Sequence, residues 1–262
     1  MALVTSRAIV LRDHRLGETS KVVVCYTRDY GKVRLVAKGV RKGGGRFGAA
    51  LEPLMVSGVV FYLREGRDLS LVSQASLERA FPELRRDVTR MALAGAVVEL
   101  LDRLLPDHEP DGELYELTER ALEVMSTLPV PALDGVLWRF MLELATRLGY
   151  RPELSRCVVC GAADDGWAGF SPELGGLVCR RCSAGDELPA ALAAGPEAAV
   201  LTELAETGLD AVTGRRFTPA ARDDITRALG SFLERHAGRS MKLKSLEFLA
   251  QVRRLEAQTA KD

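Results

Sequence analysis

The chain has 262 residues, 47% hydrophobic and 27% charged, which excludes a disordered chain and favours a folded protein of one large or two to three smaller domains. No apolar run reaches the roughly 18 residues that a membrane span needs. The N-terminus, with Arg7 inside its apolar stretch, does not have the pattern of a signal peptide, so we expect a cytoplasmic protein.

The formal net charge of zero hides an uneven distribution of charge along the chain. Residues 1–48 hold eleven Lys/Arg and three Asp/Glu, a net charge of +8. Residues 49–214 hold 14 basic and 27 acidic residues, a net charge of −13, and residues 215–256 hold ten basic and five acidic residues, a net charge of +5. This pattern predicts that one region binds a polyanion and another binds a basic or apolar partner.

The N-terminal part of the chain has the pattern of short β-strands. Segments rich in β-branched residues are separated by turns, which predicts strands at 8–11, 21–26, 32–37, 54–63 and 69–74. In the third strand, basic and apolar residues alternate, which places Lys32 and Arg34 on one face and Val33 and Leu35 on the other. Five short strands without intervening helices predict a small barrel of the OB-fold kind.

The rest of the chain has mainly a helical period. We expect helices at 83–105, 113–128, 131–148, 196–207, 219–236 and 243–257, with Gly149 as a C-cap. The predicted fold is therefore α+β and multidomain. It comprises an OB-fold nucleic-acid-binding domain (1–80), the first part of a helical domain (81–153), an inserted four-cysteine zinc-ribbon-like module (154–186), and the C-terminal part of the helical domain (187–262).

Four of the five cysteines form a CxxC-x18-CxxC pattern, namely Cys157, Cys160, Cys179 and Cys182. Two such pairs close a tetrahedron of thiolates around Zn²⁺, and four protein ligands leave no open position, so the pattern predicts a structural zinc site. Disulfides are disfavoured in the expected cytoplasmic setting, and a thioredoxin-like motif needs only one pair. Cys25 stands alone in a strand, where we expect a buried, small apolar side chain.

A glycine-rich segment, Gly43–Gly48, matches GxGxxG formally. A dinucleotide-binding fold needs a helix at that point, yet Pro53 follows closely, and a Walker A loop needs Gly-Lys-Ser/Thr, which is absent. None of the three histidines (His14, His108, His236) belongs to a recognisable catalytic motif. The segment is therefore interpreted as a basic loop between two strands, and no enzyme activity is expected.

A strongly basic segment on a small barrel predicts binding to a nucleic-acid backbone, because neutralised phosphates dominate such affinity. The candidate residues, in order of preference, are Lys38, Arg41, Lys42 and Arg46, then Lys32 and Arg34, then Arg12, Arg15 and Lys21. Aromatic residues for base stacking are few: Tyr26, Tyr30, Phe47, Phe61 and Tyr62. An RNA-binding or ribosome-associated protein, and a protein-binding zinc scaffold, remain as alternatives.

Several motifs together resemble the RecO family of bacterial recombination mediators: Leu16–Ser20 (LGETS), Lys38–Lys42 (KGVRK), Glu52-Pro53, Leu148–Gly161, Phe170–Cys182 and Leu243–Leu249. The resemblance implies an OB-fold, a helical domain and a zinc module in a nucleoid-associated protein. It implies binding of single- and double-stranded DNA, strand annealing and, with RecR, assistance to RecA loading on DNA coated by single-stranded-DNA-binding protein. The acidic tail of that protein is expected at a basic spot such as Arg139, Arg147 or the group Arg239, Lys242 and Lys244.

Overall fold

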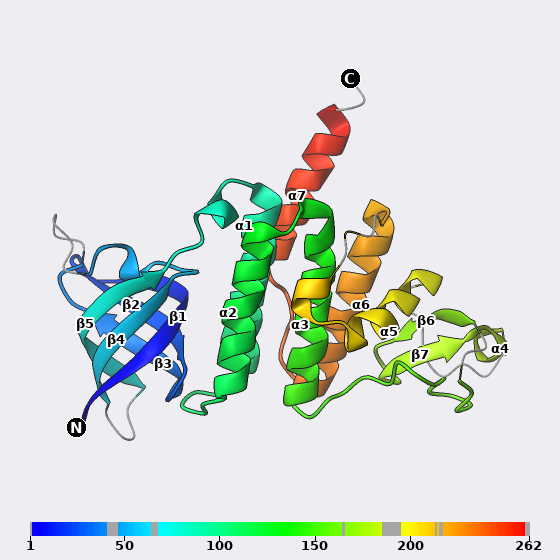
Figure 1. Cartoon of the computed structure of the whole chain (residues 1–262), viewed down its shortest axis with the longest axis horizontal. Helices are drawn as coiled ribbons and strands as arrows, with labels where there is room; N and C mark the ends of the chain where they lie inside the picture. The colour runs from blue at the N-terminus through cyan, green and yellow to red at the C-terminus, as the bar shows by residue number, and fades with distance from the viewer. Residues whose placement is uncertain are drawn as a thin grey trace. The chain divides into compact units, whose positions relative to one another are not determined.

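The computed structural model describes residues 2–40, 47–63, 68–163, 166–184, 195–212, 214 and 217–259. The chain forms two compact units. The first comprises Met1–Thr127 and Leu243–Asp262, and the second comprises Leu128–Lys242 (Figure 1). The helices expected to form one domain are thus divided, because the first two and the last belong to the same unit as the N-terminal strands.

Five strands of the first unit form a closed barrel with the order β1-β2-β3-β5-β4. They are β1 (Ala2–Leu16), β2 (Ser20–Thr27), β3 (Gly31–Ala37), β4 (Val56–Leu63) and β5 (Leu69–Arg79). The long strand β1 pairs antiparallel with both β4 and β2, and β3 pairs parallel with β5. The five predicted strands are confirmed, although β4 begins later than expected because Leu54 adopts a left-handed φ of 69°.

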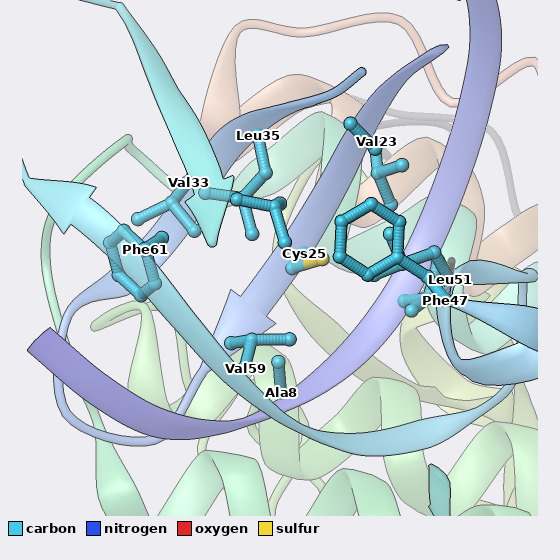
Figure 2. Packing of buried hydrophobic residues seen from close by; sticks show 12 residues of the cluster. Ala8, Val23, Cys25, Val33, Leu35, Phe47, Leu51, Val59 and Phe61 are labelled. Carbon is cyan, nitrogen blue, oxygen red and sulfur yellow. The ribbon is translucent and has the colours of Figure 1, made fainter. Parts of the chain in front are cut away.

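The barrel interior is filled by alternate residues of each strand, as the period of two requires. Val33 and Leu35 point into the core, whereas Lys32 and Arg34 lie on the outer face of β3, as predicted. The core also contains Phe47 and Leu51, which come from the segment between β3 and β4 and from its 3-10 helix η1 (Gly48–Leu51) (Figure 2). Cys25 is fully buried there, as expected.

Three α-helices accompany the barrel in the first unit: α1 (Val88–Leu104), α2 (Gly112–Thr127) and α7 (Lys244–Thr259). The predicted helix 83–105 is divided into a 3-10 turn η2 (Pro82–Arg85) and α1. The division occurs because Asp87 is extended and its side chain accepts the backbone N–H of Arg90, which caps α1 at its N-terminus. Helix α7 packs against α1.

The second unit is built around α3 (Leu133–Arg147), whose side chains are mostly buried. It also contains α5 (Val200–Glu206), α6 (Pro219–Ala237), the strands β6 (Trp167–Ser171) and β7 (Gly176–Cys179), the short helix α4 (Arg180–Ser183), and the 3-10 turns η3 (Val130–Ala132), η4 (Pro196–Ala199) and η5 (Leu209–Ala211). Gly149 follows α3 with a φ of 86°, and the N–H of Tyr150 bonds the carbonyl of Ala145 at 2.8 Å, which confirms the expected C-cap. No helix in the described part of the chain is long and apolar enough to cross a membrane.

Candidate nucleic-acid interface and metal centre

The structure brings the four cysteines of the two CxxC pairs together. The sulfur atoms of Cys157, Cys160, Cys179 and Cys182 all lie within 4.8 Å of one another, and those of Cys160 and Cys179 are 3.8 Å apart. Tetrahedral zinc with Zn–S bonds of about 2.3 Å separates its sulfur ligands by about 3.8 Å. The donor set therefore fits a metal site of the expected geometry.

Local backbone geometry positions the two pairs. The first pair lies in a tight turn in which the N–H of Gly161 bonds the carbonyl of Cys157 at 2.8 Å, and Gly161 has a φ of 74°. Cys179 ends β7, and Cys182 lies on α4, which follows at once. A hydrogen bond joins the turn of the first pair to β7: the N–H of Val158 donates to the carbonyl of Leu177 at 3.0 Å.

Hydrogen bonds distribute charge unequally among the sulfurs. Donors led by the backbone N–H of Ala162, followed by the side chain of Arg181, lower the pKa of Cys160 to about 6. The hydrogen bond that the Cys182 thiol makes to Cys160 raises the pKa of Cys182 to about 12. Four adjacent thiolates repel one another, and a divalent cation supplies the charge that lets all four ionise.

On the side of the barrel that faces α1 and α2, basic residues form ion pairs with acidic residues of α1 and of the segment between the two helices. Arg12 bonds Asp102 at 2.5 Å, and Arg34 bonds Asp107 at 2.6 Å. The Lys32 amino group is almost fully buried; it donates to the carbonyl oxygen of Asp102 at 2.7 Å and lies 3.4 Å from the Asp107 carboxylate. These three predicted DNA-binding residues are therefore engaged within the protein.

The same pattern continues along α2. Arg28 bonds Glu116 at 2.7 Å, and Arg7 bonds Glu119 at 3.0 Å. Arg79 of β5 pairs with both Glu119 and Glu123. The acidic partners recur three and four residues apart, so they share one face of the helix. Sequence reasoning missed this role of α2, although the spacing of Glu116, Glu119 and Glu123 was a visible signal.

Strand register gathers three other predicted DNA-binding residues at one end of the barrel. Arg15 of β1 is opposite Lys21 of β2, Lys21 is opposite Ala37 of β3, and Lys38 follows directly. Lys21 bonds Asp13 at 2.5 Å. Within the described part of the chain, the exposed Arg15 and Lys38 have no acidic partner. The remaining candidates, Arg41, Lys42 and Arg46, lie outside the described residues.

Comparison with known proteins gives the family. Residues 1–81 match the family model "Recombination protein O N terminal", and residues 85–247 match "Recombination protein O C terminal". The chain is 36% identical to the DNA repair protein RecO of Anaeromyxobacter sp. strain K, over 93% of this chain and 94% of that protein. It is 34% identical to the RecO of Symbiobacterium thermophilum, over 97% and 99%, and 41% identical to that of Heliobacterium modesticaldum, over 70% and 66%. The chain belongs to the RecO family of DNA repair proteins, which act in recombinational repair.

Proposed function

We propose that this chain binds single- and double-stranded DNA, anneals complementary strands and, with RecR, assists RecA loading on DNA coated by single-stranded-DNA-binding protein. Its family membership supports a role in recombinational repair. The strand order of the barrel, with β1 shared between β2 and β4 and with β3 parallel to β5, supports its assignment as an OB-fold.

The observation that carries the proposed DNA contact is the cationic end of the barrel. The exposed Arg15 lies directly opposite Lys21, and Asp13 pairs with Lys21 and not with Arg15. Lys38 adds a third cation, and the chain continues from it to Arg41, Lys42 and Arg46. We therefore propose Arg15, Lys38, Arg41, Lys42 and Arg46 as phosphate contacts. Lys21 is left out because it pairs with Asp13, and Lys32, Arg34 and Arg12 are left out because they already pair with Asp102 or Asp107.

Annealing requires no bond chemistry in this proposal. Two complementary strands repel one another through their phosphates, and a concentrated positive surface lowers that repulsion while it leaves the base edges free. The acidic faces of α1 and α2 restrict this surface to one end of the barrel. A defined place for two backbones then raises the rate at which complementary bases meet.

We propose that the four cysteines hold a structural Zn²⁺, since they leave no position for a substrate. When bound, the ion cross-links the two CxxC turns. We further propose that the acidic tail of single-stranded-DNA-binding protein binds at Arg139, at Arg147 or at the group Arg239, Lys242 and Lys244. Arg139 lines a groove of about 550 Å³ between α3 and α5 together with Arg151, and its guanidinium pairs there with Glu143 at 3.1 Å.

The proposal is tested by fluorescence anisotropy of a labelled oligonucleotide at a series of salt concentrations. The double variant Arg15→Ala/Lys38→Ala should lower the slope of log affinity against log salt by about 1.4 to 1.8, since each lost phosphate contact removes about 0.7 to 0.9. The matched control Arg28→Ala, whose guanidinium pairs with Glu116, should leave the slope unchanged. A slope that is unchanged in the double variant contradicts the proposed surface.

Two measurements separate the proposal from its alternatives. A protein-binding zinc scaffold predicts little affinity for oligonucleotides and no salt dependence. An RNA-binding or ribosome-associated protein predicts preference for RNA, so annealing rates of matched DNA and RNA strands are compared. Faster annealing of DNA supports the recombination role, and faster annealing of RNA alone contradicts it.

A further inference from the structure

The outer face of the barrel carries a row of apolar side chains on four neighbouring strands. The register places Tyr62 of β4 between Leu3 of β1 and Leu71 of β5, and places Leu71 opposite Val36 of β3. All four point outward, since their chain neighbours Val4, Phe61, Val72 and Leu35 pack in the core. Side chains directly opposite in neighbouring strands contact one another, so the row is continuous.

This row is accessible and uncharged. Leu3 is 57% exposed, and Tyr62, Leu71 and Val36 are partly exposed. The outward positions of the adjoining row, Thr5, Val60 and Gln74, are also uncharged. These two rows lack charged residues, although 27% of the chain is charged and other outer positions of the barrel form ion pairs. At its β3 side, the exposed Lys38 follows directly after the strand.

The face that OB-folds commonly use for oligonucleotides, that of strands 2 and 3, is covered in this protein. The outward residues Val22, Val24 and Tyr26 of β2 are at most 3% exposed. The Tyr26 hydroxyl donates to the carbonyl of Asp111 at 3.0 Å, and its ring lies 6.2 Å from that of Tyr115 on α2. The bases of a single strand therefore cannot stack on the outer face of β2, which is the surface that OB-folds commonly offer them.

Tyr62 is the remaining aromatic platform among the five aromatic candidates. Tyr26, Phe47 and Phe61 are buried, and Tyr30 packs edge-on against Phe61 at 5.7 Å. Tyr62 is partly exposed, as Tyr30 is, but it faces away from the core, and its strand partners on both sides are leucines. An aromatic ring flanked by aliphatic side chains, with Lys38 at one side and no carboxylate among its strand partners, suits a base whose phosphate lies towards Lys38.

We propose that Tyr62, supported by Leu3 and Leu71, stacks against a base of single-stranded DNA whose backbone runs towards Lys38. This inference rests on the proposed DNA-binding function and adds to it the residue that contacts the base. Stacking of this kind is tolerant of sequence, because every base has a π-face. It allows the protein to hold a single strand while the hydrogen-bonding edges of the bases stay free for pairing.

The test compares two ligands of equal length in fluorescence anisotropy with the full chain: oligo-dT and an abasic oligomer with the same sugar-phosphate backbone. The wild-type protein should bind oligo-dT more tightly than the abasic oligomer. Tyr62→Ala and Tyr62→Leu should each weaken oligo-dT binding about 5-fold or more, with unchanged binding of the abasic oligomer and an unchanged salt slope. Tyr62→Phe should retain the preference, because the ring remains.

Tyr62→Leu keeps apolar bulk, so it separates loss of the ring from loss of packing, and circular dichroism verifies folding of each variant. Leu77→Ala, at a leucine of β5 that is 45% exposed and outside the row, is the matched control and should have no effect. If Tyr62→Leu keeps the preference for oligo-dT, the inference is overturned. This holds also if the variant associates with itself less than the wild-type protein does, which would make the apolar row a contact between copies of the chain. If the wild-type protein binds neither ligand, the proposed function fails; equal binding of both with a steep salt slope overturns the stacking inference alone.

Discussion

At the scale of single residues, Lys32 is buried although it belongs to the most basic part of the chain. Its amino group lies between the carbonyl of Asp102, in the last turn of α1, and the carboxylate of Asp107. A helix C-terminus favours a cation at this place. Burial lowers the pKa of the amino group, and the charges of Asp107 and Asp102 oppose that change. Lys32 therefore joins the barrel to α1 within the first unit.

Lys32→Met should reduce the free energy of unfolding by about 2 kcal/mol, because it leaves buried polar groups without their partner. The change is measured by urea denaturation followed by circular dichroism. Lys38→Met, at the exposed position directly after β3, should change the free energy of unfolding by less than about 0.5 kcal/mol. A Lys32→Met variant with wild-type stability and a lower salt slope for DNA would instead make Lys32 a phosphate contact.

A second single residue, Glu123, makes the stability of the protein depend on pH. Hydrogen bonds from Arg120 and then from Arg79 lower the pKa of this carboxyl below its ordinary 4.5. A carboxyl group whose pKa is lower in the folded than in the unfolded state adds stability above the unfolded value. That contribution is lost as the pH falls through the folded pKa.

We therefore expect Glu123→Gln to reduce the free energy of unfolding at pH 7 by about 1 kcal/mol or less, since the pairs are partly exposed. The difference from wild type should shrink as the pH is lowered below 4.5, the ordinary pKa. Urea denaturation at several pH values measures this. Glu113→Gln on the same helix controls for the loss of one charge. A difference that persists or grows in acid would contradict the assigned sign.

At the scale of elements, α1 and α7 meet at a glycine. A Cβ atom on Gly95 of α1 would lie 2.5 Å from the hydroxyl oxygen of Ser245 on α7. The carboxylate of Glu99, one turn further along α1, accepts from both the N–H and the hydroxyl of Ser245. The first turn of α7 is thus held by α1, which explains a glycine inside a helix where alanine is intrinsically favoured by about 1 kcal/mol.

Gly95→Ala should destabilise the protein by about 1 to 3 kcal/mol through overpacking, despite the higher helix propensity of alanine. Adding Ser245→Gly should recover part of that loss, because it removes the clashing atoms. Thermal unfolding of the two single variants and the double variant gives the coupling energy. A stabilised Gly95→Ala variant would show that α7 does not pack at this point.

At the scale of the whole molecule, the proposed DNA contacts and the proposed metal ligands lie in different compact units. The cationic end of the barrel belongs to the first unit, and all four cysteines belong to the second. Because structural zinc contributes directly to the folding free energy of the part that binds it, metal loss should act mainly on the second unit.

The expected zinc content is one ion per chain, measured by elemental analysis of protein purified without chelators. Cys157→Ala should lose the metal and make residues 128–242 more sensitive to trypsin, with oligonucleotide affinity changed less than about 3-fold. Cys25→Ala is the control, because burial raises the pKa of this thiol to about 12 and Cys25 is not one of the four clustered cysteines, so zinc should be retained. Zinc-free wild-type protein would contradict the metal site.

The sequence by itself determined most of the strands and helices and the set of four clustered cysteines. Strand and helix patterns depend on neighbours a few residues apart, so the five strands and the α3 C-cap at Gly149 were predictable, and the cysteine spacing specifies its own geometry. Only the tertiary structure decided which cations are free. Lys32 and Lys38 are alike in sequence, but Asp102 and Asp107 come from distant residues that folding brings to Lys32 and not to Lys38. Likewise, Tyr26 and Tyr62 differ in exposure because α2 covers β2 and leaves β4 uncovered at Tyr62. Charge and stacking depend on contacts across the fold, which a local pattern does not contain.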